Sequence, residues 1–323
     1  MTEPSPLLLI VSARHAGTRL DAYLAEKLAA HSRSRIQDWI EAGHIRTDSG
    51  RARPHTRVRT GMRLHVSPPP PPSLQPEPEP IPLHILHEDQ DLLALNKPPG
   101  LVVHPAAGHA AGTLVNALMH HCRHLPESDD PCRPGIVHRL DQYTSGVMVA
   151  AKSERALRSL RAQFKNRSVG KIYLALACGS PEPPAGCIDT LIGRHARHRK
   201  KMAAHALDDP APAPLAGAGR RAISHYERLE SFGCACLLQV RIETGRTHQI
   251  RVHLATIGHP LLGDSVYGGK QSALGSIPAI PAPSRPMLHA HRLALRHPAD
   301  GRPLEFTAPM PADMTRLLAA LRR

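Results

Sequence analysis

The sequence is poor in aromatic residues and in long apolar runs. Phe, Trp and Tyr make up only 3% of its 323 residues, so its core must be built mainly from Leu, Val, Ile and Ala. No run approaches the roughly 20 apolar residues that a membrane-spanning helix needs. The N-terminal region holds only the short apolar run 7–11. We therefore expect no membrane segment and no signal peptide.

Cysteine is also scarce. The six cysteines are scattered over a long chain and lack the spacing of a disulfide framework. Cys234 and Cys236 should point to one face of a strand, where small buried side chains are favoured over metal ligands. His289 and His291 are too isolated to form a metal pair. The sequence thus predicts a reduced, cytoplasmic protein without a metal.

What the chain has in excess is positive charge. Lys and Arg number 41 against 27 Asp and Glu, which gives a formal net charge of +14 and a pI near 10.1. A chain this basic usually binds a polyanion, and nucleic acid is the first candidate. Most of the cations are Arg, which suits planar contacts to phosphate. A genome rich in G and C would also enrich Arg, so composition alone leaves both explanations open.

Proline divides the chain into two predicted domains. Residues 1–16 are expected to be an extension, and residues 17–67 a small module that opens with a helix over 19–30. Residues 68–82 contain nine prolines and predict an extended linker. At about 3.1 Å per residue such a linker would span about 45 Å. Residues 83–323 form the larger domain.

The small module is rich in arginine. Ser34 and Gln37 form a capping-box pair, which predicts a second helix from about Arg35 to Ala42. Arg33 and Arg35 lie at its start, and five more arginines follow between positions 51 and 63. We favour a helix and loop that bind RNA phosphates, with a solvated basic face as the alternative.

The larger domain shows more strands than helices. Ser153 is a candidate N-cap for a helix over 154–166. Apolar runs predict strands at 147–151, 172–177, 235–242 and 288–295. Because these strands do not alternate regularly with helices, an α+β domain with a mixed or antiparallel sheet is favoured over a doubly wound fold. The loops 208–219 and 271–286 are expected to be irregular insertions.

One segment, His138–Gly146, carries the clearest catalytic signal. It places a single carboxylate, Asp141, between Arg139 and a tight polar turn, just before a buried strand. An adjacent Arg favours the ionised form of a carboxylate, which can then act as a nucleophile or a base. Asp141 is therefore the catalytic candidate. An ordinary Arg–Asp ion pair at the end of a strand is the alternative.

Three further segments carry side chains that suit RNA. Arg246 and Arg251 lie at the expected start of a helix and could bind phosphate, or belong to a surface basic helix. Tyr173 opens a strand and could stack on a base, exchange a proton or be a core aromatic. Arg194 and Lys201 flank a basic loop that could bind RNA or only aid solubility.

Together these segments resemble the RluA-type pseudouridine synthases over nearly the whole chain. The order of His138–Gly146, Lys171–Tyr173 and Gly245–Arg251 matches the family's motifs, and Asn96–Gly100 is similar to its first motif. Residues 17–67 resemble a small RNA-binding module that a ribosomal protein also carries. The stretches 100–118 and 193–202 are similar to the RluD branch, which modifies large-subunit ribosomal RNA.

The resemblance implies that uridine is isomerised to pseudouridine in RNA without metal or organic cofactor. Asp141 would attack the ribose C1′ or assist glycosidic cleavage, and Arg246 would pair with it. Arg139 would fill the helical space left by the flipped uridine. Tyr173 would pack on the flipped base and is the candidate for the final proton transfer. Phosphates would be held by Arg251, Arg194, Lys201 and Lys97.

Some positions depart from the family pattern, and other functions stay open. Gln142 and Tyr143 replace the more usual Lys-Asp pair, and the Pro-rich linker is unusually long. A non-catalytic RNA-binding or ribosome-assembly factor, or a pseudouridine synthase that acts on tRNA, are the alternatives. A glycoside hydrolase would need a second catalytic carboxylate, and no second acidic motif is found. We expect a monomer whose partner is RNA and not a membrane.

Overall fold

The chain divides into two compact units, residues 1–73 and residues 74–323. The computed structural model describes residues 7–29, 31–48, 50–69, 75–106, 109–198, 201–207, 215, 217, 219–268 and 283–323. The first part is called the small unit here and the second the large unit. Most of the two expected insertions, 208–219 and 271–286, lies outside the described residues.

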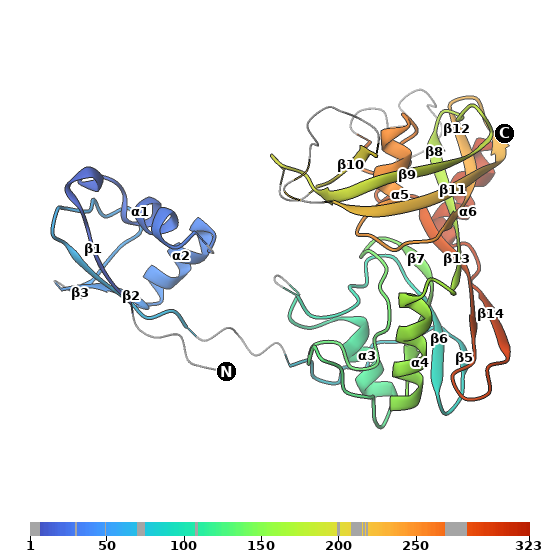
Figure 1. The fold of residues 1–323 in the computed structure, drawn as a ribbon, viewed down its shortest axis with the longest axis horizontal. Helices are drawn as coiled ribbons and strands as arrows, with labels where there is room; N and C mark the ends of the chain where they lie inside the picture. The colour runs from blue at the N-terminus through green and yellow to red at the C-terminus, as the bar shows by residue number, and fades with distance from the viewer. Residues whose placement is uncertain are drawn as a thin grey trace. The chain divides into compact units, whose positions relative to one another are not determined.

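The small unit is a four-stranded antiparallel sheet covered by two helices (Figure 1). The strands lie in the order β1-β4-β2-β3, and its core contains Ile36, Trp39 and Ile40 from the expected apolar face of the second helix. Gly43 follows that helix with a φ of 83°, a left-handed conformation that favours glycine. The elements are β1 (Leu7–Ile10), α1 (Leu20–Lys27), α2 (Arg33–Glu41), β2 (Ile45–Thr47), β3 (Gly50–Arg51) and β4 (Arg63–Val66).

Two expectations for the small unit are wrong. Strand β1 belongs to the sheet and pairs with β4, so residues 1–16 are not wholly an extension. It coincides with the apolar run 7–11, but its side chains are mostly exposed, so backbone pairing with β4 holds the strand in the sheet. Helix α2 begins at Arg33 because Ser32, not Ser34, is its N-cap and accepts a hydrogen bond from the Arg35 N–H. The earlier start lets Arg33 bind the buried Asp21 carboxylate.

Part of the Pro-rich linker is docked on the large unit. The backbone oxygen of Glu77 accepts a hydrogen bond from Asn116 Nδ2 at 2.7 Å, and the Glu79 N–H donates to the Asn116 oxygen at 3.0 Å. The Glu79 carboxylate also accepts from the Gly112 N–H. The segment 68–82, predicted to be an extended linker, is therefore docked in part on the large unit; residues 70–74 lie outside the described ranges.

The large unit is built on one long, mainly antiparallel sheet. Its strands lie in the order β10-β9-β11-β12-β8-β13-β7-β6-β5, with β14 paired to β13, and only β13 and β7 run parallel. The strands are β5 (Ile85–Glu88), β6 (Leu92–Lys97), β7 (Ser145–Ala151), β8 (Gly170–Cys178), β9 (Ala185–Arg194), β10 (Met202–Ala206), β11 (Arg220–Ser231), β12 (Ala235–Ile242), β13 (Leu288–Arg296) and β14 (Pro303–Thr307). The helices are α3 (Leu114–His121), α4 (Glu154–Lys165), α5 (Gln249–Thr256) and α6 (Ala312–Leu321). The α+β expectation is confirmed.

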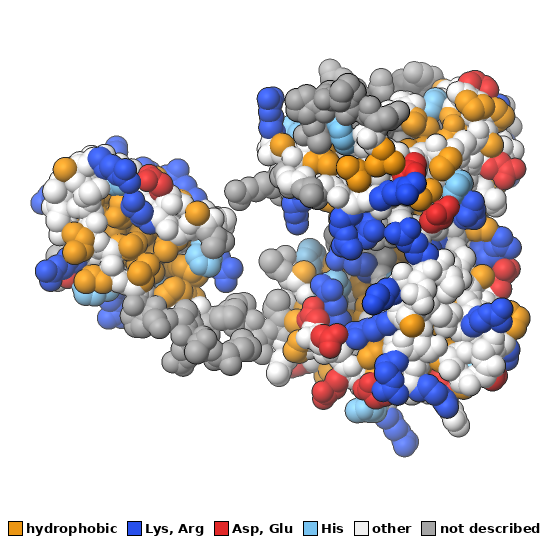
Figure 2. Space-filling model, in the orientation of Figure 1, with side chains coloured by type: hydrophobic (Ala, Val, Ile, Leu, Met, Phe, Trp, Pro, Cys, Tyr) orange, Lys and Arg blue, Asp and Glu red, His pale blue; other side chains and the backbone are white. Residues whose placement is uncertain are grey.

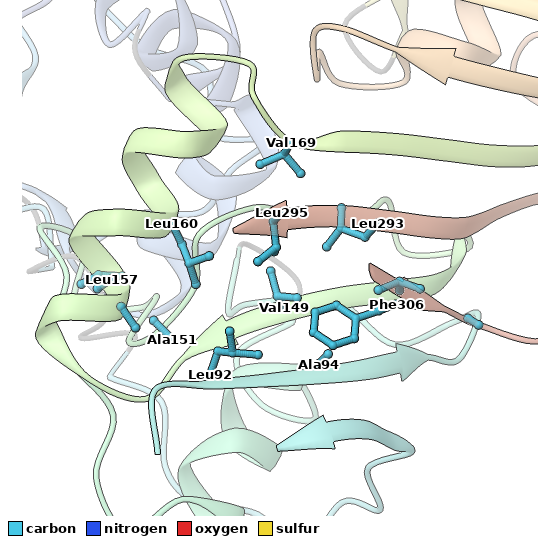
Figure 3. Close-up of a cluster of buried hydrophobic side chains, with 13 residues drawn as sticks. Leu92, Ala94, Val149, Ala151, Leu157, Leu160, Val169, Leu293, Leu295 and Phe306 are labelled. Atoms are coloured by element: carbon cyan, nitrogen blue, oxygen red, sulfur yellow. The ribbon is translucent and has the colours of Figure 1, made fainter. Parts of the chain in front are cut away.

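Helix α4 closes one core of the large unit (Figure 3). Leu157 and Leu160 point from the helix toward β6, β7 and β13, where Val149 and Leu295 meet them. The helix starts as expected, because the Ser153 hydroxyl accepts a hydrogen bond from the Ala156 N–H. This packing fixes strand β7, whose first residues lead back to the Asp141 segment.

The three central strands bring two distant candidate residues together. Ala290 of β13 is paired with Gly146 of β7 on one side and with Tyr173 of β8 on the other. Gly146 has a φ of 117°, and a Cβ there would lie 2.1 Å from the Ala290 oxygen. Only glycine allows this close approach. The turn that carries Asp141 is thereby held next to Tyr173.

Candidate active site

Asp141 lies in a tight turn whose backbone is hydrogen-bonded on several sides. The backbone oxygen of Asp141 accepts a hydrogen bond from the Thr144 N–H at 3.1 Å and closes the turn. The next carbonyl, that of Gln142, accepts from the Gly100 N–H at 2.9 Å. The Tyr143 oxygen accepts from Arg285 Nη1 at 3.1 Å. With its backbone so restrained, the turn presents the Asp141 carboxylate in one orientation.

Lys97 anchors the same turn from inside the protein. Its side chain is fully buried, and Nζ donates to the oxygens of Pro98, Leu101 and Gln142 at 2.8 to 3.0 Å. Burial lowers the pKa of Lys97 to about 7, although Asp141 acts in the opposite direction. Three carbonyl acceptors match the three donors of an ammonium group. The expectation that Lys97 binds RNA phosphate is therefore wrong, because the group does not reach the surface.

His138 holds the strand side of the segment. Its Nε2 accepts a hydrogen bond from the Val149 N–H at 3.0 Å, and its ring stacks on Phe164 at 4.5 Å between centroids. Burial lowers the pKa of His138 to about 3, so the ring is neutral. The neighbouring Arg139 is exposed and lines the cavity in front of Asp141. Because His138 is fixed, the exposed side chain of the next residue, Arg139, is held in a position that would suit insertion into an RNA helix.

The opposite wall is the loop before helix α5. The side chain of Gln249 organises this loop, because its oxygen accepts from the Thr244 hydroxyl and from the Arg246 N–H. Its nitrogen donates to the Ile223 oxygen and to the Ser224 hydroxyl, both at 3.0 Å. All four hydrogen-bonding positions of the amide are used. The loop is thus fixed to strand β11 by a buried polar side chain.

Arg251, not Arg246, is the cation beside Asp141. Its Nη1 lies 3.8 Å from Asp141 Oδ2, while Nε and Nη2 donate to both oxygens of Asp264 at 2.7 and 2.9 Å. The Arg251 side chain is 8% exposed, and that of Asp264 is fully buried. Burial acts to lower the pKa of Arg251, but the hydrogen bonds and charge of Asp264 raise it overall.

Two expectations are corrected by this geometry. The pairing of Arg246 with Asp141 is wrong, and Arg251 is a buried bridge between two carboxylates instead of a phosphate ligand. Arg246 lines the cavity and donates from Nε to the Arg221 oxygen at 3.2 Å. Its pKa is lowered by burial and by the nearby cations Arg220 and Arg167. Because Arg246 is surrounded by other cations, an anionic group of the ligand, such as a phosphate, would be a favourable partner for it.

His248 and Tyr267 complete this wall and were not identified from the sequence. His248 Nε2 lies 4.0 Å from Asp141 Oδ2, and the residue has a left-handed backbone with a φ of 56°. Its Nδ1 is 2.8 Å from the Tyr267 hydroxyl. Tyr267 also packs its ring against the Arg251 guanidinium at 5.1 Å. His248 lies within the motif Gly245–Arg251, whereas Tyr267 follows helix α5 in the short stretch Gly263–Tyr267, which resembles an ordinary turn.

Tyr173 forms the floor of the cavity together with apolar side chains. It comes from strand β8, and Ile242 and Leu288 line the cavity beside it. Burial, and then the nearby Asp141 charge, raise the pKa of Tyr173 well above its usual value. The phenol therefore stays neutral near pH 7. An aromatic and aliphatic surface facing one carboxylate fits a flat, uncharged ring.

The cavity is open to solvent and surrounded by cations. It contains about 550 Å³ of space free of protein atoms, part of which is open solvent. Figure 2 shows Lys and Arg side chains gathered across the middle of the large unit, on the face drawn there. Within the described residues, no cluster of three or more His, Cys, Asp and Glu side chains could hold a metal. No described helix has the length and apolar character of a membrane span.

Arg194 and Lys201 are not among the residues that line this cavity, and Arg33 and Arg35 belong to the small unit. Arg194 ends strand β9 and is exposed, and the Lys201 backbone is hydrogen-bonded to His195 and His198. Positions 199 and 200 of the basic loop lie outside the described residues. In the small unit, Arg33 binds Asp21 and Arg35 packs over the Trp39 ring at 5.6 Å.

Two family models match this chain, one in each unit. The family model of RNA pseudouridylate synthases matches residues 91–256, and that of the S4 domain matches residues 18–64. The chain is 42% identical to ribosomal large subunit pseudouridine synthase D of Pseudomonas aeruginosa, over 95% of this chain and 93% of that protein. It is 43% identical to the protein of that name from Nitrosomonas europaea, over 97% and 87%.

A solved structure is also similar. Human RNA pseudouridylate synthase domain containing 4 is 28% identical, with a TM-score of 0.56, over 74% of this chain and 93% of that chain. The match therefore covers about three quarters of this chain and nearly all of the human one.

Proposed function

The chain belongs to the RNA pseudouridylate synthase family, and from that premise we propose that its substrate is large-subunit ribosomal RNA. Two relatives at 42% and 43% identity, matched over nearly the whole chain, are named as large-subunit enzymes. The S4 domain supplies a second RNA-binding surface, with eleven Lys and Arg against five Asp and Glu in residues 7–67. The protein is further proposed to act in the cytoplasm as a monomer whose partner is RNA.

Asp141 is the catalytic carboxylate of this proposal. The observation that carries it is the position of Asp141 at the cavity, where Arg251 and His248 approach the same oxygen, Oδ2. Asp264 neutralises most of the charge of Arg251, so Asp141 is held by that cation without being fully paired. An ionised carboxylate with a free lone pair can attack the ribose C1′ or assist departure of the uracil.

The other groups bind and confine the uridine. Tyr173 packs against the base, and its neutral phenol can deliver or accept a hydrogen bond while the uracil turns to present C5. Arg139 takes the place of the extruded nucleotide in the RNA, because base flipping leaves an unstacked gap. Arg246 binds the phosphate next to the target. The apolar side chains of Ile242 and Leu288 limit water around the detached base.

A site-resolved pseudouridine map of ribosomal RNA tests the substrate. Cells that lack the gene are compared with cells that carry either the wild-type chain or Asp141→Asn. Loss of specific large-subunit sites, restored by the wild type alone, is the expected result. An unchanged ribosomal map, with sites lost in tRNA instead, would contradict the proposed substrate. Unchanged maps of every RNA class would contradict the enzymatic function.

A further inference from the structure

His248 and Tyr267 form a hydrogen-bonded unit that faces Asp141 from the α5 side. The Tyr267 hydroxyl oxygen accepts a hydrogen bond from the Met202 N–H at 2.9 Å and lies 2.8 Å from His248 Nδ1. The two rings meet edge to face with centroids 5.6 Å apart. Tyr267 therefore touches the start of strand β10, the N-cap of helix α5 and, through its ring, Arg251.

The hydrogen bonds of Tyr267 favour one of the two neutral tautomers of His248. A phenol has one hydrogen to donate, and its oxygen can accept. Because the Tyr267 oxygen already accepts from Met202, its own hydrogen is free to be donated to His248 Nδ1. A neutral imidazole that accepts at Nδ1 carries its proton on Nε2. Burial lowers the pKa of His248, which agrees with a neutral ring.

The free Nε2–H then points toward the carboxylate across a gap. The separation of 4.0 Å between His248 Nε2 and Asp141 Oδ2 is too long for a direct hydrogen bond. A group between them must accept from the imidazole and donate to the carboxylate. A hydroxyl does both, and an oxygen about 2.8 Å from each atom would see them at an angle of about 90°, which suits a hydroxyl. A uracil carbonyl accepts but cannot donate.

We propose that His248 donates its Nε2–H to the 2′-hydroxyl of the target ribose, that this hydroxyl donates to Asp141, and that Tyr267 fixes the tautomer. The proposal rests on the proposed function and deepens it. It makes His248 a substrate-contacting residue and Tyr267 a positioning residue. It also gives the site a reason to prefer RNA over DNA at the reacting nucleotide, because DNA lacks the bridging hydroxyl.

The tautomer is measured directly by two-bond ¹H–¹⁵N correlation of the histidine rings in the full-length protein. The His248 signals are assigned by their loss in His248→Asn. The wild type should show the Nε2–H tautomer, and Tyr267→Phe should show a mixture or the Nδ1–H form. Tyr226→Phe is the matched control, because it removes a hydroxyl that donates only to the Pro183 oxygen at 3.4 Å, away from the cavity. An Nδ1–H tautomer in the wild type would overturn the proposal.

The contact to the ribose is measured by single-turnover kinetics on an RNA fragment with either ribose or 2′-deoxyribose at the target uridine. We expect the single-turnover rate of the wild type to be about 10- to 100-fold lower with the deoxy substrate than with the ribose substrate. In His248→Asn this loss should shrink at least about fivefold, because one partner of the hydroxyl is already gone. The deoxy sugar also changes the intrinsic reactivity of the glycosidic bond, but this effect is the same for the wild type and for His248→Asn and cancels when the two losses are compared. Equal losses in the two proteins, within about twofold, would overturn the contact.

The choice of variants keeps folding and function separate. Asn tolerates the left-handed backbone of position 248 better than most residues, so His248→Asn removes the ring with little strain. His248→Gln can reach the Nε2 position with an N–H donor and should regain part of the lost rate. No gain over Asn, in a variant whose thermal unfolding is unchanged, would argue against the donor. A wild type that makes no pseudouridine would overturn the proposed function and the ribose contact together, whereas the tautomer measurement would still stand by itself.

Discussion

Asp141 and Asp264 share one guanidinium, that of Arg251. Asp264 takes two short hydrogen bonds at 2.7 and 2.9 Å, whereas Asp141 lies 3.8 Å away. The unequal sharing keeps Arg251 fixed and leaves Asp141 available to a substrate. The two carboxylates therefore have different functions although they contact the same cation.

Asp264→Ala is expected to destabilise the fold as well as the activity. It leaves the buried Arg251 without its main partner, and breaking a buried ion pair from one side reduces stability by about 3–5 kcal/mol. Urea unfolding monitored by circular dichroism measures the change. Asp189→Ala is the control, since its partner Arg221 is largely exposed and its loss should barely move the unfolding midpoint. Equal midpoints for Asp264→Ala and the wild type would contradict this role of Asp264.

Lys97→Met should reduce stability without weakening RNA binding. The Nζ group donates to three backbone oxygens, and leaving such acceptors unsatisfied reduces stability by about 1–3 kcal/mol. Thermal unfolding and a salt titration of RNA affinity are measured on the same protein. A reduced dependence of affinity on salt would show that Lys97 contacts phosphate after all.

Arg246→Ala should give the opposite pattern. The side chain sits among other cations at the cavity, where a phosphate is the expected partner. Its loss should weaken RNA binding and lower the slope of log affinity against log salt by about 1, with little change in stability. An unchanged slope would contradict phosphate binding by Arg246.

Acid should destabilise the large unit partly through His138. The pKa of His138 is about 3 in the folded protein and 6.5 ordinarily, because the ring is buried. Between pH 3 and pH 6.5 the unfolded chain binds a proton at His138 and the folded chain does not. The stabilisation contributed by the neutral ring is therefore complete above pH 6.5 and is lost as pH falls toward 3. At pH 4.5 the loss from this residue is roughly 2–3 kcal/mol. Urea unfolding at pH 7.5 and 4.5 should show less pH dependence for His138→Gln than for the wild type; equal dependence would contradict the assignment.

Deleting residues 1–67 should weaken RNA binding and flatten its salt dependence. This segment carries eleven of the 41 Lys and Arg residues and contains the region that matches the S4 domain. Phosphate contacts release counterions, so their loss lowers the salt slope. The matched protein is the full chain, measured with the same RNA. An unchanged slope would show that the small unit contributes no phosphate contacts.

The sequence predicted the fold and the site correctly where the residues that determine a feature lie close together in the chain. Helix α4 was predicted correctly because its apolar spacing and the Ser153 cap lie within a few residues of each other. The turn around Asp141 was recognisable because its polar residues directly precede a buried strand. The mixed, mainly antiparallel sheet followed from counting strands that do not alternate with helices.

The sequence failed where a partner is remote or a charge is buried. Arg251 lies 13 residues from Asp264, and nothing in either segment shows that the two meet inside the fold. Lys97 resembles a surface cation in sequence, but its environment is set by carbonyls from three separate positions. Proline composition predicts an extended linker over 68–82 but gives no sign of the hydrogen bonds that Glu77 and Glu79 make to Asn116.

The measurement that tests the account most directly compares purified wild type and Asp141→Asn on the same large-subunit RNA. Pseudouridine formation is followed in a single turnover, and RNA affinity is measured in parallel. We predict that Asp141→Asn lowers formation at least about 10⁴-fold while affinity stays within about threefold, because the amide keeps the shape and loses the nucleophile. Pseudouridine formation at a rate near that of the wild type would contradict the assignment of Asp141 as the catalytic carboxylate.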